Sequence, residues 1–219
     1  MAFSIQAKAA ALPLWQASLD HPFIEQLSAG TLPEAVFRYY LIQDHHYLRD
    51  FAKLHELTAA ATTDPKVTAL LLELAADLRA GEMATRATYF KTLKITDDEV
   101  ATTPLAPTTY AYTSHMYRTL TEQGPEAAIA GLLPCAWLYA DIGETLTGKQ
   151  SPVPIYQAWL DSYQAASYTD AVATQLALTD RVAAHADEQT QQAMNAAFKR
   201  STFYECSFWQ MALDQETWA

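Results

Sequence analysis

Three segments of this chain of 219 residues carry side chains that could do chemistry. Cys135 follows Pro134 in an apolar stretch that predicts a helix, and Glu205 lies among aromatic residues near the end of the chain. Asp44 stands one helical turn before Tyr47. Covalent catalysis with proton transfer requires groups of this kind: a thiol, a carboxyl group in apolar surroundings and a second carboxylate. They form a catalytic site only if the fold brings them together.

Each of these groups also has a purely structural interpretation. Cys135 can be a small buried hydrophobic residue and Pro134 a kink, although proline inside an isolated helix costs roughly 3 kcal/mol. Glu205 can be a glutamate that pairs with a tyrosine or an arginine, whereas desolvation would favour its protonated form and suit a proton donor. These segments alone leave both interpretations open. Cys135 and Cys206 are the two cysteines of the chain, and we interpret both as free thiols because one pair does not make a disulfide framework.

Composition favours one large helical domain. Half of the residues are apolar, enough for a single core, and only six are glycine, fewer than the turns of a sheet protein require. No repeat or linker divides the chain, so we expect one all-α domain over residues 1–219 with about seven to nine helices. The net charge of −11 disfavours nucleic acid and anionic membranes as partners. Residues 1–8 lack a signal-peptide pattern and no run is apolar enough to span a bilayer, so we expect a cytoplasmic protein.

Caps and prolines predict where the helices begin and end. Pro13 should bend or interrupt a first helix that has Leu12 on its apolar face, and Asp20 should cap a short helix that Gly30 ends. A capping box from Thr31 to Glu34 should open a long helix. The expected helices cover about residues 3–19, 22–29, 34–61, 65–93, 107–123, 125–148, 156–163, 168–184 and 187–213, with a short turn at 96–99.

Metal and nucleotide chemistry have little support in the sequence. His45 and His46 are adjacent, so on a helix they point in different directions. No Glu-x-x-His pair, P-loop, G-x-G-x-x-G, G-x-S-x-G or H-E-x-x-H motif is present. We therefore expect no metal and no cofactor. The isolated histidines are expected to cap helices or lie on the surface: His21, His55, His115 and His185.

Several short segments occur in the order typical of a known family. They are His21-Pro22-Phe23, Gly30 to Pro33, Phe37, Tyr40, Gln43-Asp44, Tyr47-Leu48, Leu133 to Tyr139, Gly143, Tyr204-Glu205 and Phe208-Trp209. Together they resemble the TenA family, the thiaminase II or aminopyrimidine aminohydrolase group, in its cysteine-containing branch. The resemblance extends from the first short helix to the last helix, which is nearly the whole chain.

The resemblance implies a haem-oxygenase-like all-α bundle without haem, assembled as a homotetramer. It implies hydrolysis of 4-amino-5-aminomethyl-2-methylpyrimidine to the hydroxymethylpyrimidine and ammonia, and cleavage of thiamine to the hydroxymethylpyrimidine and the thiazole alcohol. At matching positions, Cys135 is the expected nucleophile, Glu205 the acid and base, and Asp44 the group that binds the amino side of the pyrimidine. The residues expected to line the site are Tyr47, Phe51, Tyr112, Tyr139, Tyr163 and Phe208, with Phe51 standing where many members have tyrosine.

This chemistry needs a thiolate, so we expect donors such as Tyr47 to lower the pKa of Cys135. Two alternatives remain. A non-catalytic or regulatory protein that binds a pyrimidine or thiamine could use the same fold, but a binder needs neither the nucleophile Cys135 nor the proton donor Glu205. A haem or di-iron oxygenase is disfavoured because the sequence lacks carboxylate-histidine pairs.

Overall fold

Helices make up all the regular secondary structure in the described part of the computed structural model, which is residues 1–218 apart from the side chain of Glu82. Their bounds are α1 Phe3–Ala10, α2 Leu12–Leu19, α3 Pro22–Ala29, α4 Glu34–Ala61, α5 Pro65–Thr85, a π-helical turn η1 Arg86–Phe90, α6 Lys91–Leu93, α7 Asp97–Thr102, α8 Pro107–Gln123, α9 Pro125–Thr145, α10 Pro154–Gln164, α11 Ala166–His185 and α12 Glu188–Asp214.

The break between the first two helices is one of the two outcomes predicted for Pro13. The backbone leaves the helical region at Ala11 (φ −101°, ψ 4°), so residues 3–19 form two helices and not one bent helix. Pro13 lies in the first turn of α2, where its missing N–H needs no partner. Leu12 is consequently 53% exposed, and its predicted place on the apolar face is wrong.

Two of the predicted caps are also wrong. His21, not Asp20, caps α3, because its Nδ1 accepts a hydrogen bond from the Phe23 N–H at 3.2 Å. Pro33 occupies the N-cap of α4 without any side-chain hydrogen bond, so Thr31 does not form the expected capping box. Proline fits there because its fixed φ is compatible with the extended backbone that precedes the helix (φ −61°, ψ 135°).

The other boundaries follow the prediction to within a few residues. The helices α4 and α8 coincide with the predicted ranges 34–61 and 107–123. Residues 65–93 are helical throughout but include the π-helical turn, and α9 ends at Thr145, slightly before the predicted Gly148. The described chain has more helices than predicted because the first one splits and because the short α6 and α7 are separate.

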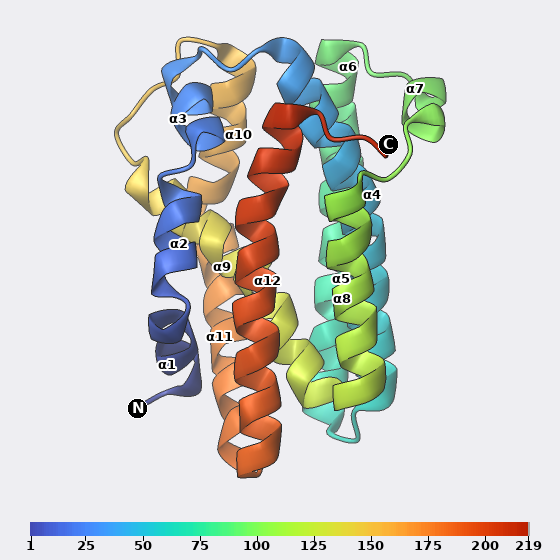
Figure 1. Ribbon diagram of the computed structural model, residues 1–219, viewed down its shortest axis with the longest axis vertical. Helices are drawn as coiled ribbons and strands as arrows, with labels where there is room; N and C mark the ends of the chain where they lie inside the picture. Colours follow the sequence, from blue (N-terminus) through green and yellow to red (C-terminus); the bar gives the residue numbers. More distant parts are fainter. Residues whose placement is uncertain (219) are drawn as a thin grey trace.

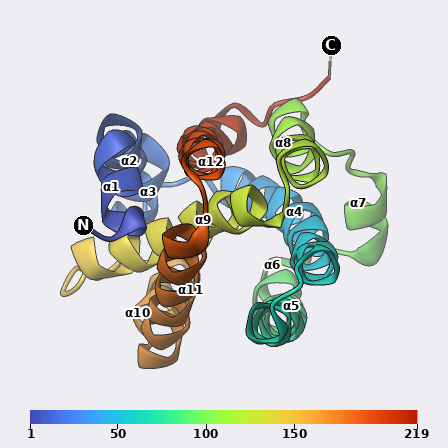
Figure 2. The same ribbon diagram turned by 90° about the horizontal axis from the view of Figure 1, so that it is seen from below.

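Helices α4, α8, α9 and α12 pack against one another. α12 runs along the length of the molecule, and α9 crosses α12 diagonally (Figures 1 and 2). α12 also contacts α8, α4 and the N-terminal helices α1 to α3, whereas α10 and α11 pack on α9. Their buried faces form one large core rich in aromatic rings. No helix within residues 1–218 is both long and apolar enough to cross a bilayer.

Gly143 marks a close approach between α9 and α10. A Cβ added there would lie 2.6 Å from the carbonyl oxygen of Tyr163 and 2.8 Å from its carbon, which are backbone atoms. We expect Gly143→Ala to push the helices apart and to lower the free energy of unfolding by about 1–3 kcal/mol, measured by urea denaturation. Gly131→Ala on the same helix is the control, since its Cβ would meet Ala197 and Ser201 at ordinary distances of 3.5 and 3.6 Å. Equal stability of the two variants would contradict this packing constraint.

Candidate active site

The Cys135 side chain of α9 and the Glu205 side chain of α12 meet where the two helices pack together. They are close enough for the carboxyl group to influence the pKa of the thiol through a side-chain hydrogen bond and through its charge. Cys135 packs against core residues but keeps part of its surface accessible, whereas Glu205 is only 3% exposed. The fold therefore brings together two groups that are distant in the sequence.

Glu205 has the properties of a proton donor. Burial raises the pKa of Glu205 to about 8, and the charge of Asp44 acts in the same direction. The Tyr112 hydroxyl donates a hydrogen bond to Oε1 at 2.6 Å, which lowers this pKa without offsetting the effect of burial. A carboxyl group with this pKa is largely protonated at neutral pH and can transfer a proton to a bound molecule.

The thiol of Cys135 differs from the expectation. Its pKa is raised well above the ordinary value, first by burial and then by the charges of Glu205 and Asp44. Tyr47 lowers the pKa, as predicted, but this effect is smaller than that of burial. The prediction that the pKa of Cys135 is lowered is therefore wrong for the chain without a bound substrate. A thiol in these surroundings has to lose its proton during a reaction and not before it.

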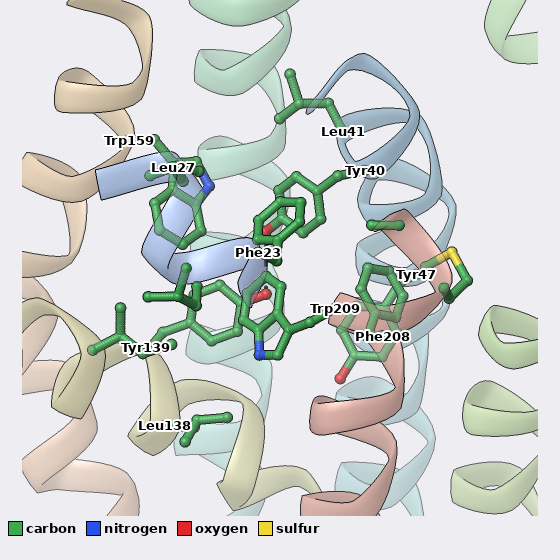
Figure 3. Packing of buried hydrophobic residues seen from close by; sticks show 14 of the residues in the cluster. Phe23, Leu27, Tyr40, Leu41, Tyr47, Leu138, Tyr139, Trp159, Phe208 and Trp209 are labelled. Atoms are coloured by element: carbon green, nitrogen blue, oxygen red, sulfur yellow. Dashed lines mark hydrogen bonds between the residues drawn. The ribbon is translucent and has the colours of Figure 1, made fainter. Parts of the chain in front are cut away.

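Tyr47 packs among aromatic rings near Cys135, and its ring lies beside that of Phe208 (Figure 3). Its ring centre lies 5.0 Å from that of Tyr112 and 5.7 Å from that of Phe208, and Phe51 stacks on it at 5.2 Å. The Tyr47 hydroxyl lies close to Cys135 and Tyr112, but in the described part of the chain it makes no hydrogen bond of ordinary length and angle. Because a buried hydroxyl without a partner is costly, this group is suited to bind a polar atom of a ligand.

Tyr139 and Tyr163 form a second group of packed aromatic rings. Their ring centres lie 4.8 Å apart, and the hydroxyl groups of Tyr139 and Tyr40 share a hydrogen bond of 3.1 Å. Burial raises the pKa of all three tyrosines, and the charge of Asp44 raises it further. Asp44 therefore faces the same region as these phenols and as the thiol of Cys135.

Phe51 supports the ring of Tyr47 and packs edge-on against His55 at 4.7 Å. His55 is buried in the core, where burial lowers its pKa to about 4, and His115 is half-buried, so the expected surface or capping roles of both are wrong. Among the side chains that the structure describes, no group of three or more His, Cys, Asp or Glu is arranged to hold a metal ion. Two histidines lie at helix ends, as predicted: His21 and His185.

Two further tyrosines face the site. Tyr40 lies one turn before Asp44 on α4, so the helical spacing of the sequence already indicates it. Tyr168 of α11 donates a hydrogen bond to the Ala136 carbonyl oxygen at 3.1 Å. Burial, followed by the charges of Cys135 and the nearby carboxyl groups, raises the pKa of Tyr168. No local pattern predicts Tyr168, because its place depends on how α11 packs against α9.

Solved structures define the class of fold. A domain from Shewanella denitrificans OS217 with a heme oxygenase-like fold has a TM-score of 0.73 at 12% identity, covering 96% of this chain and 92% of that chain. A TenA homologue protein from P. horikoshii OT3 has a TM-score of 0.89 at 26% identity, covering 98% and 99% of the two chains. The fold is a haem-oxygenase-like all-α bundle, as the resemblance implied.

Sequence relatives define the family. The model of the TENA/THI-4/PQQC family matches residues 8–215. The aminopyrimidine aminohydrolase of Bacillus subtilis (strain 168) is 36% identical over 219 residues, which are 100% of this chain and 93% of that protein. The chain belongs to the TENA/THI-4/PQQC family.

Proposed function

We propose that the chain is a hydrolase of thiamine salvage. It converts 4-amino-5-aminomethyl-2-methylpyrimidine to the hydroxymethylpyrimidine and ammonia, and it cleaves thiamine to the hydroxymethylpyrimidine and the thiazole alcohol. The observation that carries this proposal is the Cys135 thiol beside a protonated Glu205 among aromatic rings. The name of the Bacillus subtilis relative, aminopyrimidine aminohydrolase, supports the same reaction.

Side chains of several helices are proposed to bind the pyrimidine. Asp44 accepts hydrogen bonds from the ring amino group, and the unpartnered Tyr47 hydroxyl binds a second polar atom. The Asp44 carboxylate also favours a substrate whose aminomethyl group is a cation, because opposite charges attract strongly away from water. The flat apolar faces come from Tyr112, Tyr139, Tyr163 and Phe208, with Phe51 supporting Tyr47.

The first chemical step is addition of the thiol to the ring. Glu205, protonated near neutral pH, gives its proton to a ring nitrogen while the sulfur of Cys135 bonds to an electrophilic ring carbon. The proton of the thiol passes to the carboxylate that results. The step therefore adds sulfur and hydrogen across one ring carbon–nitrogen bond and leaves Glu205 protonated. The raised pKa of the thiol is compatible with this route, because no free thiolate has to accumulate.

The following steps exchange ammonia for water. Once addition has broken the aromaticity, the ring electrons expel ammonia from the attached methylene. Water then bonds to this methylene and releases one proton. When the sulfur leaves, the ring nitrogen returns its proton through Glu205, so that the aromatic ring and the thiol are both restored. Covalent catalysis of this kind divides one difficult displacement into several easier steps.

A product assay separates the enzyme from its alternative. The purified chain is incubated with the aminomethylpyrimidine or with thiamine, and hydroxymethylpyrimidine and ammonia are quantified over time. We expect equal amounts of both products from the aminomethylpyrimidine. Tight binding of either compound without any product would contradict the hydrolase and support a non-catalytic pyrimidine-binding or regulatory protein.

Assembly and location belong to the same proposal. We propose a homotetramer that acts in the cytoplasm without nucleic acid, membrane, metal or cofactor as a partner. The net charge of −11 supports the absence of polyanionic partners, because nucleic acid and anionic lipid would be repelled. Size-exclusion chromatography with light scattering tests the tetramer.

A further inference from the structure

Gln43 is a fully buried amide on α4, next to Asp44 and 0% exposed. Its Nε2 donates a hydrogen bond to the Pro104 carbonyl oxygen at 2.9 Å. Its Oε1 accepts hydrogen bonds from the Ala106 N–H and the Thr109 hydroxyl, each at 2.9 Å. A single side chain of α4 therefore holds the loop before α8 and the first turn of α8.

The segment after α12 reinforces the same end of α8 from outside. The Glu216 carboxylate accepts a hydrogen bond from the Thr108 N–H at 2.9 Å, and Trp218 donates one to the Leu105 carbonyl oxygen at 2.8 Å. Trp218 is exposed, so its bond competes with water. The bonds from Gln43 to Ala106 and Thr109 are buried and face no such competition.

The anchored turn leads directly to the proposed site. Tyr112 follows Thr109 by one turn of α8, and its hydroxyl donates to Glu205 at 2.6 Å. A small shift of this turn relative to α4 would lengthen that bond. We propose that Gln43 is a positioning residue that fixes the start of α8 so that Tyr112 can donate its hydrogen bond to Glu205.

The chemistry of an amide suits this position. Gln43 provides a donor and an acceptor on one rigid group, which is what the Pro104 carbonyl and the Ala106 N–H require. An ionised carboxylate could not donate to Pro104. An apolar side chain of equal length would leave both backbone groups unpaired, which favours movement of the segment towards water.

The titration of Glu205 reports on this arrangement without an assay of turnover. The hydrogen bond from Tyr112 lowers the pKa of Glu205, so loss of that bond should raise the midpoint, by about one unit. Infrared spectroscopy of protein labelled with ¹³C-glutamate measures the midpoint, with Glu205→Gln as the blank. The titratable groups that face Glu205 are Asp44 and Tyr47 of α4, Tyr112 of α8, Cys135 and Tyr139 of α9, and Tyr168 of α11.

The variants separate positioning from stability. Gln43→Met should raise the midpoint as much as Tyr112→Phe, and the double variant should raise it no further. Thr109→Val removes one of the three bonds to Gln43 and should give a smaller rise, whereas Thr109→Ser should give none. The control is Tyr156→Phe on α10, which loses a buried hydrogen bond to the Leu32 carbonyl oxygen and leaves the contacts of Gln43 and Glu216 in place. It should lower the melting temperature and leave the midpoint unchanged.

The proposal is overturned if the midpoint of the Glu205 titration rises in Tyr112→Phe but stays unchanged in Gln43→Met. If Gln43→Met does not fold, a wild-type midpoint in Thr109→Val overturns the proposal. A wild-type midpoint in Tyr112→Phe also overturns it. The inference rests on the proposed function in one respect only. A variant that raises the midpoint of Glu205 should shift the alkaline limit of turnover to higher pH by the same amount. Absence of turnover would refute the function and leave the titration result intact.

Discussion

Replacement of Cys135 by serine should reduce ammonia release from the aminomethylpyrimidine by about 10³-fold or more. Serine has nearly the same shape, so the surroundings of the side chain should persist. Its hydroxyl is a much weaker nucleophile than a thiol and gives up its proton far less readily. Glu205 could still protonate the ring, but no covalent adduct would form to expel the amine. The measurement is the rate of ammonia release at saturating substrate.

Cys206 provides the matched control for this variant. It is the other cysteine of the chain and follows Glu205 on α12, but its thiol lies near Ser18 of α2. Cys206→Ser should therefore keep nearly full activity, and both variants should melt within a few degrees of the wild type. Turnover of Cys135→Ser at the wild-type rate would rule out the nucleophile role.

Replacement of Glu205 by glutamine should lower kcat by about 10²–10⁴-fold and change KM little. The amide keeps the shape and can still accept the hydrogen bond from Tyr112, but it can neither protonate the ring nor take the proton from the thiol. In the wild type, activity should fall as the pH rises through about 8, where Glu205 ionises. This alkaline limit should be absent from the residual activity of Glu205→Gln. A variant that binds poorly but turns over normally would contradict the assignment.

The same ionisation predicts an effect on stability that needs no substrate. The pKa of Glu205 is raised from an ordinary value of 4.5 to about 8 in the folded chain, so the folded state keeps a proton that the unfolded state releases. Stability from this group is complete below the unfolded pKa and is lost as the pH rises through the folded pKa. Glu205→Gln lacks this loss, so its stability relative to the wild type should increase from about pH 6 to about pH 9. Urea denaturation at both pH values measures it, and a constant difference would contradict a buried, titrating acid.

The helical frame is largely readable from the sequence because its signals are local. Pro107 begins α8, and Gly124 with Pro125 separates α8 from α9, since proline fits a first turn and glycine tolerates a positive φ. The caps are less predictable. His21 and Asp20 compete for the same end of α3, and the ring nitrogen of His21 is the group placed to accept the Phe23 N–H.

The site could be predicted only in part. The helical spacing of α4 groups Tyr40, Asp44 and Tyr47 on one face, and the structure agrees. The sequence cannot indicate that Tyr168 of α11 faces the same region, because that contact depends on tertiary packing. The raised pKa of Cys135 was likewise unpredictable, since it follows from burial beside carboxyl groups of other helices.

Modification of a single thiol tests the central claim most directly. In Cys206→Ser protein, Cys135 is the one remaining cysteine. The protein is treated with a small methylthiolating reagent, and the added mass and the residual hydrolysis are measured on the same samples. Our account predicts that activity falls in proportion to modification, reaches zero at one group per chain, returns on reduction, and is protected by hydroxymethylpyrimidine. A fully modified protein that still releases ammonia at the wild-type rate would contradict it.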